Sequence, residues 1–348
     1  ANQASEVKRD TPIMCVIGNP PYSGESSNKS DWIMKLMEDY KKEPGGHEKL
    51  KEKNPKWIND DYVKFIRYSQ ELIEKNGEGL IAFINNHSFL DNPTFRGMRW
   101  KLLKTFDKIF VFDLHGNSKK KEKSPDGSKD ENVFDIQQGV SINFFIKTGE
   151  KKKDQLGSVF HSEIYGKRNV KYGFLSKNNI NSVQYEEVNA LGPNYYFIPR
   201  DYTAKEKYDE GFSVNDLFLV KSVGIVTARD KFTIHPSEED IKKTIKLFLE
   251  LGDEEARKEF NLGKDVRDWK VKYARKDLED SGPDFEKIQK ISYRPFDDRY
   301  TYYTGNSKGF HCYPRGGVMD NFIEKINISL ALCKQFKTGN EYQHALIS

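Results

Sequence analysis

The stretch Met14-Cys15-Val16-Ile17-Gly18-Asn19-Pro20-Pro21-Tyr22 decides which fold we expect for this chain. The apolar run from Ile13 to Ile17 predicts a short buried strand. Two consecutive prolines fix φ and have no N–H, so the strand cannot continue past Asn19. We therefore expect Asn19 to lie extended at the carboxyl end of the strand, where open α/β sheets bind their ligands.

The tetrapeptide from Asn19 to Tyr22 suits the recognition of an exocyclic amine. The Asn19 side-chain oxygen and the Pro20 carbonyl are two acceptors close together, and both can accept from one NH₂ group. Tyr22 can then stack on a flipped-out base that carries the amine. The alternative is a rigid turn without chemistry. Because a strand precedes the tetrapeptide and an α/β pattern follows it, we favour the functional interpretation.

Composition indicates a folded chain with more than one domain. The 348 residues suffice for two domains with separate cores. Only 36% of residues are hydrophobic and 32% are charged, but the 23 Phe and 18 Tyr favour a globular rather than a disordered chain. The net charge of +4 permits a polyanionic partner without requiring one.

Location is expected to be cytoplasmic, without a membrane partner. Apolar runs stay well below the roughly 20 residues that span a bilayer, and the first residues have no signal-peptide character. The cysteines Cys15, Cys312 and Cys333 are scattered and have no CxxC spacing. This pattern indicates a reducing compartment and argues against a zinc site, so we expect no metal.

The first half alternates helical and strand patterns. A helix is expected from Asp60, ending at Asn76-Gly77, and is followed by an apolar strand from Gly79 to Ile84. This alternation is typical of a parallel sheet. Further expected elements are a helix at 94–105, strands at 108–114 and 138–147, a loop at 115–131 and a hairpin at 159–168. Polar clusters at the strand ends, including 85–89, predict one functional rim.

The second half begins near 194–202. Short strands are expected at 214–220 and 224–229, followed by charged amphipathic helices at 238–251, 254–262 and 266–279.

Several motifs resemble known enzymes. Asn19-Pro20-Pro21-Tyr22 resembles motif IV of the amino-methyltransferases that methylate adenine N6. The runs Asn86-His87-Ser88-Phe89-Leu90-Asp91, Phe112-Asp113-Leu114-His115-Gly116-Asn117 and 130–140 resemble the methyltransferase part of type ISP restriction–modification enzymes. Those are single polypeptides that join a nuclease, a helicase-like translocase, an adenine methyltransferase and a target-recognition domain. The resemblance covers most of this chain.

The resemblance implies a fold, a cofactor and partners. The fold would be α/β: a Rossmann-like methyltransferase sheet lacking its first strands, followed by an α+β target-recognition domain. Residues 1–190 would form the C-terminal part of the N6-adenine methyltransferase domain, and residues 191–348 an incomplete specificity domain. S-adenosylmethionine would be the cofactor. Double-stranded DNA, a flipped adenine and the parent's nuclease, helicase and N-terminal methyltransferase segments would be partners.

The resemblance also implies site residues. Asn19, Pro20, Pro21 and Tyr22 match the catalytic motif. Phe134 matches the aromatic residue that covers the other face of the flipped base, with a core position as its alternative. Cofactor contacts would come from Asn19 and from the helix residues Tyr62 and Phe65, for which a core role is equally compatible.

One departure from the family pattern concerns the cofactor site. The Gly-rich turn and the acidic residue that hold S-adenosylmethionine precede the Asn-Pro-Pro-Tyr motif in this family, and only 18 residues precede Asn19 here. The Gly-x-Gly sequence Gly77-Glu78-Gly79 lies before a predicted strand rather than after one, so it predicts a turn and not a cofactor-binding loop. The sequence therefore predicts an internal piece of a longer enzyme.

Basic and aromatic residues interleave near 291–303, where DNA contacts are expected. Arginine can pair with guanine or with phosphates. The alternative is a strand in which Tyr300 and Tyr302 pack on one face and Arg299 pairs with Asp297 or Asp298. The resemblance to the family's specificity region favours DNA contact for some of five candidates: Arg229, Arg294, Arg299, Tyr300 and Arg315.

Two other functions remain open from the sequence. Asn-Pro-Pro-Tyr also occurs in methyltransferases that act on RNA bases or on glutamine side chains of proteins. The chain could also be a DNA-binding specificity fragment that is inactive alone.

Overall fold

The computed structural model describes residues 11–24, 26–52, 55–152, 154–294, 296–323, 325–332 and 345–347. The chain forms two compact units, 1–206 and 207–348. A six-stranded mixed sheet lies in the first unit, and the second unit contains a three-stranded sheet and a two-stranded sheet. The fold is therefore mixed α/β, as the sequence predicts.

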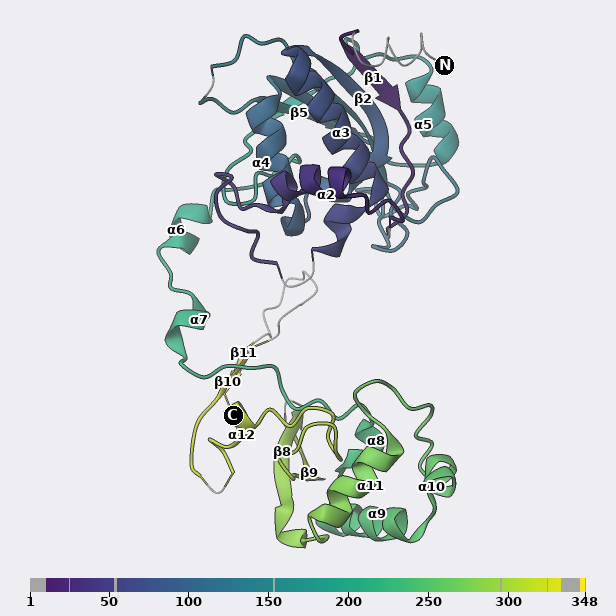
Figure 1. Ribbon diagram of the computed structural model, residues 1–348, viewed down its shortest axis with the longest axis vertical. Coiled ribbons are helices and arrows are strands. Elements are labelled where there is room, and N and C mark those ends of the chain that lie inside the picture. The colour runs from purple at the N-terminus through teal and green to yellow at the C-terminus, as the bar shows by residue number, and fades with distance from the viewer. Residues whose placement is uncertain are drawn as a thin grey trace. The chain divides into compact units, whose positions relative to one another are not determined.

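The sheet of the first unit has the order β1-β2-β4-β3-β5-β6. Figure 1 labels β1, β2 and β5 of this sheet. Its strands are β1 (Cys15–Gly18), β2 (Gly79–Asn86), β3 (Lys108–Asp113), β4 (Val140–Lys147), β5 (Ser158–Glu163) and β6 (Glu186–Val188). β1 runs parallel to β2 and β3 runs parallel to β5, while β4 is antiparallel to both β2 and β3. Consequently β1, β2, β3 and β5 all end at the same edge.

Helices connect these strands. They are α2 (Asp31–Met37), α3 (Asp61–Asn76), α4 (Arg96–Thr105) and α5 (Arg168–Leu175), with short 3-10 turns η1 (Glu38–Lys41), η2 (Lys56–Asn59), η3 (His87–Phe89) and η4 (Pro93–Phe95). α3 ends where Gly77 adopts a φ of 88° as its C-cap, and Gly79 begins β2. The Gly77-Glu78-Gly79 sequence is thus a helix-to-strand turn, as predicted.

The two faces of the first sheet are covered unequally. On one face, α3 and α4 pack over Ile81, Phe145 and Val111, which belong to the main core of the unit. On the other face, α5 and the segment after it contact Phe112 and Ile142. The rest of that second face is open: Leu80, Ala82, Phe144 and Ile146 are only half-buried.

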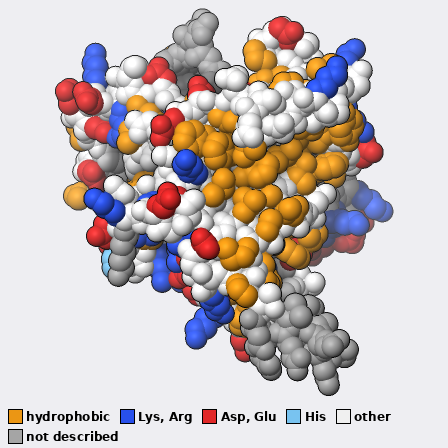
Figure 2. Space-filling model, turned by 90° about the horizontal axis from the view of Figure 1, so that it is seen from above, with side chains coloured by type: hydrophobic (Ala, Val, Ile, Leu, Met, Phe, Trp, Pro, Cys, Tyr) orange, Lys and Arg blue, Asp and Glu red, His pale blue; other side chains and the backbone are white. Residues whose placement is uncertain are grey.

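The open face continues onto β1, which corrects one prediction. β1 is not a buried strand: it lies at the edge of the sheet, and Ile17 is 77% exposed. The apolar run is real, but the described residues place no strand on the outer edge of β1. Figure 2 shows hydrophobic side chains gathered in a broad patch on one face of the molecule.

The second unit packs helices against a small antiparallel sheet of order β7-β9-β8. Its elements are α6 (Lys205–Asp209, across the boundary), α7 (Val214–Leu217), α8 (Asp230–Thr233), β7 (Ile234–His235), α9 (Glu238–Glu250), α10 (Asp253–Glu259), α11 (Val271–Asp280), η5 (Phe285–Lys287), β8 (Ile288–Arg294), β9 (Asp297–Tyr302), α12 (Gly316–Met319), β10 (Leu330–Leu332) and β11 (Ala345–Ile347). Phe232, Trp269 and Phe310 lie at the centre of its core.

Three predicted strand segments are wrong. Residues 214–217 form a helical turn capped by the Ser213 hydroxyl, which accepts from the Asn215 N–H. Residues 224–229 make only an isolated bridge through Val226, and Ala228 has a φ of 62°, which interrupts extended backbone. The predicted hairpin at 159–168 is instead β5 followed by α5.

No helix within the described residues is both long and apolar enough to cross a membrane.

Candidate functional site

The predicted rim is present at the carboxyl edge of the first sheet. Asn19 follows β1, His87 follows β2, Asp113 ends β3 and Glu163 ends β5. Because these four strands run in the same direction, the polar residues that end them gather along one edge.

The Asn19–Tyr22 segment is held at this edge by its tyrosine. The Tyr22 hydroxyl lies 3.1 Å from the Ile84 carbonyl and 3.2 Å from the Asn19 Oδ1, within donating distance of both. Burial raises the pKa of Tyr22, so the hydroxyl stays protonated and remains a donor. Asn19 is exposed and Pro20 is buried. The Asn19 amide oxygen is thus oriented while its side chain stays accessible.

Phe134 is placed on the same apolar cluster as Tyr22. Both half-buried aromatic rings pack against Phe112, Leu114, Val133 and Val140. The Phe134 N–H donates to Asn132 Oδ1 at 2.8 Å, and the Arg168 guanidinium donates to the Phe134 carbonyl at 2.9 Å. The structure therefore places two aromatic residues that are far apart in the sequence on one apolar cluster, and one of them, Tyr22, bonds to Asn19.

The two predicted cofactor residues on α3 differ in exposure. Tyr62 is 1% exposed, and its ring meets the Tyr22 ring edge-on at 6.2 Å. Phe65 is 47% exposed. Tyr62 thus supports Tyr22 from the core, which is the core role left open by the sequence, while Phe65 remains available for contact.

These residues do not form a complete site for S-adenosylmethionine. The Gly77 and Gly79 pair closes the turn into β2 rather than a loop after a strand. β1, whose end carries Asn19, has an unpaired outer edge among the described residues. The described residues therefore leave this edge of the predicted site open.

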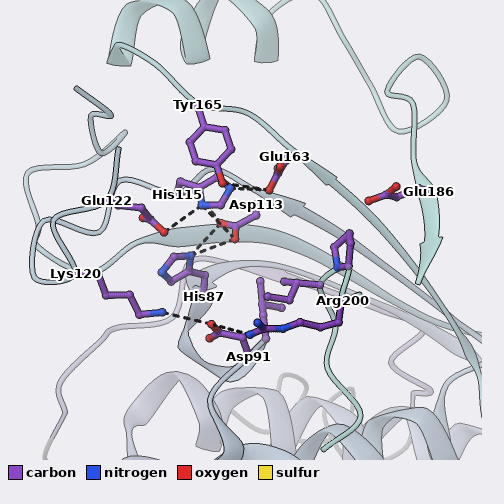
Figure 3. Close-up of a pocket in the computed structure, with 13 residues that line it drawn as sticks. His87, Asp91, Asp113, His115, Lys120, Glu122, Glu163, Tyr165, Glu186 and Arg200 are labelled. Atoms are coloured by element: carbon purple, nitrogen blue, oxygen red, sulfur yellow. Dashed lines mark hydrogen bonds and ion pairs between the residues drawn. The ribbon is translucent and has the colours of Figure 1, made fainter. Parts of the chain in front are cut away.

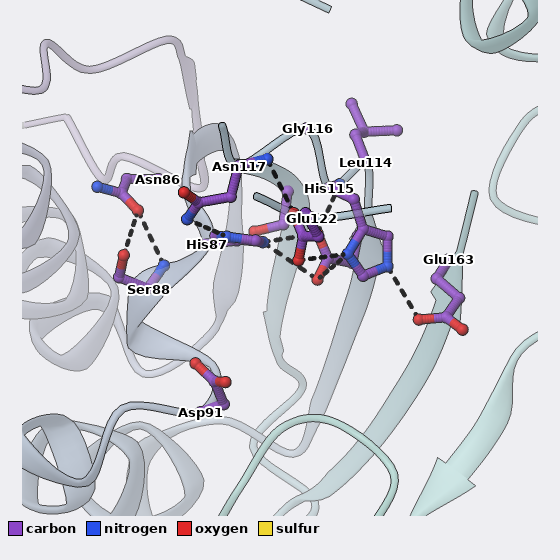
Figure 4. A network of polar contacts seen from close by, with 12 residues as sticks. Asn86, His87, Ser88, Asp91, Leu114, His115, Gly116, Asn117, Glu122 and Glu163 are labelled. Atoms are coloured by element: carbon purple, nitrogen blue, oxygen red, sulfur yellow. Dashed lines mark hydrogen bonds and ion pairs between the residues drawn. The ribbon is translucent and has the colours of Figure 1, made fainter. Parts of the chain in front are cut away.

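The most concentrated polar cluster of the rim is a histidine–carboxylate network (Figure 4). Asp113 Oδ1 lies 3.0 Å from His87 Nδ1, and the Asp113 Oδ2 lies 3.6 Å from His115 Nδ1. His115 also lies 3.3 Å from Glu122 Oε1 through Nδ1 and 3.0 Å from Glu163 Oε2 through Nε2. His87, Asp113 and His115 are all buried.

The network shifts the pKa values of its members. Burial lowers the pKa of His115, but the hydrogen bonds to Glu122 and Glu163 outweigh it and raise the value to about 9. Burial raises the pKa of Asp113, but His87 and His115 together lower it below its ordinary value. The hydrogen bond from His115 likewise lowers the pKa of Glu163.

A cavity of about 430 Å³ adjoins the network (Figure 3). It is lined by five carboxylates, Asp91, Asp113, Glu122, Glu163 and Glu186, against the two basic side chains Lys120 and Arg200. The excess of acidic groups makes this cavity attractive to a cation rather than to a phosphate.

In the second unit, two of the predicted DNA contacts are engaged internally. The Arg229 guanidinium donates to the Lys264 carbonyl at 2.8 Å and lies over the Trp269 ring. Arg299 donates to Asp297 through Nε at 2.9 Å and through Nη2 at 2.9 Å. This is the Arg299–Asp297 pair that the sequence left open as the alternative to a DNA contact.

The other predicted DNA contacts are more accessible or less completely bonded. Arg294 is exposed at the end of β8, and its guanidinium lies 5.1 Å from the Tyr293 ring. Tyr300 is half-buried on β9. Arg315 has a φ of 61°, and its Nε is buried without a hydrogen-bond partner among the described residues.

Sequence reasoning passed over the His87, Asp113 and His115 cluster as a site. Its members stood within the motifs quoted for the resemblance and at predicted strand ends. The sequence could not show which loop residue contacts these three residues. Glu122, which bonds to His115, lies in the 115–131 loop, and the sequence of this loop has no periodic pattern from which its course could be predicted.

Two family models match this chain. Residues 3–120 match the Eco57I restriction-modification methylase, and residues 216–348 match the Type ISP C-terminal specificity domain. The resemblance drawn from the motifs is confirmed by both matches. No curated protein matches the chain.

Solved structures show the same fold. A structure of the ATP-dependent Type ISP restriction-modification enzyme LlaBIII bound to DNA has 23% identity and a TM-score of 0.54, covering 87% of this chain and 21% of its own. A nuclease-deletion mutant of LlaGI in complex with a DNA substrate mimic has 21% identity and a TM-score of 0.54, covering 86% and 31%. A DrdV–DNA complex has 21% identity and a TM-score of 0.55, covering 95% and 34%. The chain spans a fifth to a third of these proteins.

Proposed function

We propose that this chain carries the base-binding half of an adenine-N6 DNA methyltransferase, followed by part of its target-recognition domain, within a type ISP restriction–modification enzyme. The observation that carries the proposal is the placement of Asn19 at a strand end, bonded to Tyr22, which packs on the same apolar cluster as Phe134. The matches to a restriction-modification methylase and to a specificity domain support it.

The Asn19 segment would bind and polarise the adenine amine. The Asn19 Oδ1 and the Pro20 carbonyl accept from the two N–H groups, which increases electron density on the nitrogen. Tyr22 fixes the Asn19 oxygen through its hydroxyl, 3.2 Å away. Tyr22 and Phe134 would hold the flipped base between them. Catalysis by this chain's residues would therefore come from positioning and electrostatics rather than from a covalent intermediate.

S-adenosylmethionine would supply the methyl group, and its binding site would be completed by another segment. The open edge of β1 can pair with a further parallel strand, and the exposed Ile17 marks apolar surface that such a segment would cover. Phe65, exposed on α3, would face the completed site.

The test measures transfer of labelled methyl groups to mixed-sequence duplex DNA by the longer polypeptide that contains this chain. We expect label as N6-methyladenine, and a loss of about 10²–10³-fold in rate for Asn19→Ala, because one polarising acceptor is removed. Asn181→Ala, at an exposed position outside the Asn19–Tyr22 segment, is the matched control. Label on RNA or protein but not on adenine in DNA would overturn the substrate proposed.

A second candidate function is a specificity fragment that binds DNA but not the cofactor. The open β1 edge favours it for this chain taken alone. Calorimetry with S-adenosylmethionine discriminates between the two candidate functions. Micromolar binding by residues 1–348 would contradict the specificity fragment that does not bind the cofactor.

The exposed Cys15 thiol offers a second readout. We expect maleimide to label it rapidly in the isolated chain and at least tenfold more slowly where the completing segment covers β1. Equal labelling rates in the two proteins would show that β1 stays uncovered.

A further inference from the structure

We propose that His87, Asp113 and His115 form a binding site for a divalent transition-metal ion, with Zn²⁺ as the expected occupant and the Glu122 carboxylate beside His115. This site is separate from the base-binding residues and does not depend on the proposed methyl transfer. Ligand atoms of His87, Asp113 and His115 lie within 4.8 Å of one another, and all three residues are buried.

Three ligand atoms of the cluster lie close enough together to share one ion. Zn²⁺ bonds to imidazole nitrogen and carboxylate oxygen are about 2.0–2.1 Å long, so neighbouring ligand atoms lie about 3.3 Å apart around the ion. Asp113 lies 3.0 Å from His87 Nδ1 through Oδ1 and 3.6 Å from His115 Nδ1 through Oδ2. Two imidazoles and one carboxylate form a three-ligand donor set that suits Zn²⁺ and leaves its fourth position to water.

The groups around the cluster already orient one ligand for a metal. His115 Nε2 donates to Glu163 Oε2 at 3.0 Å, which leaves Nδ1 directed toward Asp113 and Glu122. A carboxylate that holds the far nitrogen of a ligating histidine is the common arrangement around bound zinc. The Tyr165 ring stacks on the His115 ring with centroids 3.9 Å apart, which further fixes its plane.

His87 is also held in place. A Cβ at Gly139 would come within 2.4 Å of the His87 ring, so glycine is required for the ring to lie there. His87 Nε2 lies 3.2 Å from the Asn117 side-chain amide. A metal at Nδ1 would place the proton on Nε2, which faces the Asn117 side chain. Because Asn117 Oδ1 accepts from the Lys120 N–H at 3.1 Å, Asn117 would exchange that bond for one from His87 when the ion binds.

The adjoining cavity gives the ion a route to the cluster. Asp91 and Glu186 add negative charge to its lining, which raises the local concentration of cations. Because His115 belongs to the 115–131 loop, a bound ion would tie that loop to the ends of β2 and β3. Cysteine spacing bears only on zinc sites with cysteine ligands, and these ligands contain no cysteine.

The first experiment measures metal in the full chain. We expect about one Zn²⁺ per chain after purification, and a melting temperature that falls by several degrees when a chelator removes it, since an ion bound only by the folded state stabilises that state. Co²⁺ added to the stripped protein should give the visible absorption bands of tetrahedral coordination. A stripped wild-type chain that shows neither Co²⁺ bands nor a Zn²⁺-dependent melting temperature would overturn the proposal.

Two variants assign the site. Glu163→Gln retains the size of a partly exposed side chain that orients His115 through Nε2, so folding should persist while Zn²⁺ affinity falls about 10–100-fold. Glu186→Gln, which lines the same cavity outside the donor set, is the matched control and should bind as the wild type does. Equal affinity of both variants would place the ion elsewhere and reject the site, leaving the cluster as a hydrogen-bonded network only.

Discussion

The rim of the first unit and the three-stranded sheet of the second unit both carry many charged residues, but they pair these charges differently. In the rim, partners come from distant parts of the chain: His115 and Glu163 are 48 residues apart. In the second sheet, Arg299 pairs with Asp297, two residues away. Convergence of distant groups requires the whole fold to hold them, whereas a local pair needs only one strand.

This difference separates a site from a charged surface. A sequence rich in arginine and tyrosine, such as 291–303, predicts contact with DNA only if its charges are left without internal partners. The rim has the opposite character, because its groups bond to one another around a cavity that keeps an excess of carboxylates.

The largest expected effect concerns the rim's buried ion pair. Lys171 Nζ lies 2.7 Å from Asp130 Oδ1, and both side chains are fully buried. Asp130 in turn accepts from the Gly116 and Gly166 N–H groups. Lys171→Met would leave Asp130 buried without its counter-charge and destabilise the first unit by about 3–5 kcal/mol. Denaturant unfolding followed by hydrogen exchange of the first unit measures this loss.

The control is Lys167→Met, at an exposed position four residues earlier. If the two variants unfolded at the same denaturant concentration, the rim would not depend on its distant pairs, and the comparison between the two regions would fail.

The order of elements could be predicted because apolar periodicity fixes it. The helix ending at Gly77, the strands after it and the rim of polar strand ends all follow from such patterns. The exposure of β1 could not be predicted from the sequence, because an apolar run looks the same whether its strand lies at an open edge or in the centre of a sheet. The strands predicted at 214–220 and 224–229 were wrong for another reason. In the first segment, the Ser213 side chain caps a helical turn, and in the second, the positive φ of Ala228 interrupts the extended backbone.

The site residues divide in the same way. Asn19 to Tyr22 lie in one tetrapeptide, so the sequence alone is enough to predict them as a site. The sequence could not assign the role of Tyr62, because an aromatic residue at that position of a helix can face either a core or a ligand. Its burial in the structure indicates the core role. Glu122 belongs to a loop, and its position beside His115 depends on the tertiary fold.

A second expected effect contrasts the two buried histidines. In the second unit, the hydrogen-bond partner of His311 is a hydroxyl and not a carboxylate. The Thr301 hydroxyl donates its proton to the Thr233 carbonyl. The same hydroxyl oxygen therefore accepts from His311 Nε2–H, at 2.8 Å. His311 Nδ1 is buried without a partner among the described residues. Burial lowers the pKa of His311 from 6.5 to about 4, whereas the carboxylates raise that of His115.

The sign of the pH effect follows from that lowered pKa. The unfolded state takes up a proton near pH 6.5 and the folded state only near pH 4, so stability of the second unit is complete above pH 6.5 and falls between these values. The loss reaches about 3 kcal/mol. Unfolding measured from pH 7.5 to 4 checks it, with His311→Asn, which cannot titrate, and His47→Asn, at an exposed site, compared in parallel. A wild-type slope identical to that of His311→Asn would contradict the assignment.

The smallest expected effect tests the arginines of the second sheet directly. Arg294 is exposed, while the Arg299 guanidinium is already bonded to Asp297. If the unit contacts DNA through this sheet, Arg294→Ala should weaken binding several-fold, by about 1 kcal/mol, and reduce the salt dependence by about one phosphate contact. Arg299→Ala should change the salt dependence less, because a paired guanidinium releases fewer counterions on binding. Titration of duplex DNA at several salt concentrations measures both slopes. Equal reductions in the two variants would mean that the Arg299–Asp297 pair opens on DNA, and that local pairing does not remove an arginine from the DNA-binding surface.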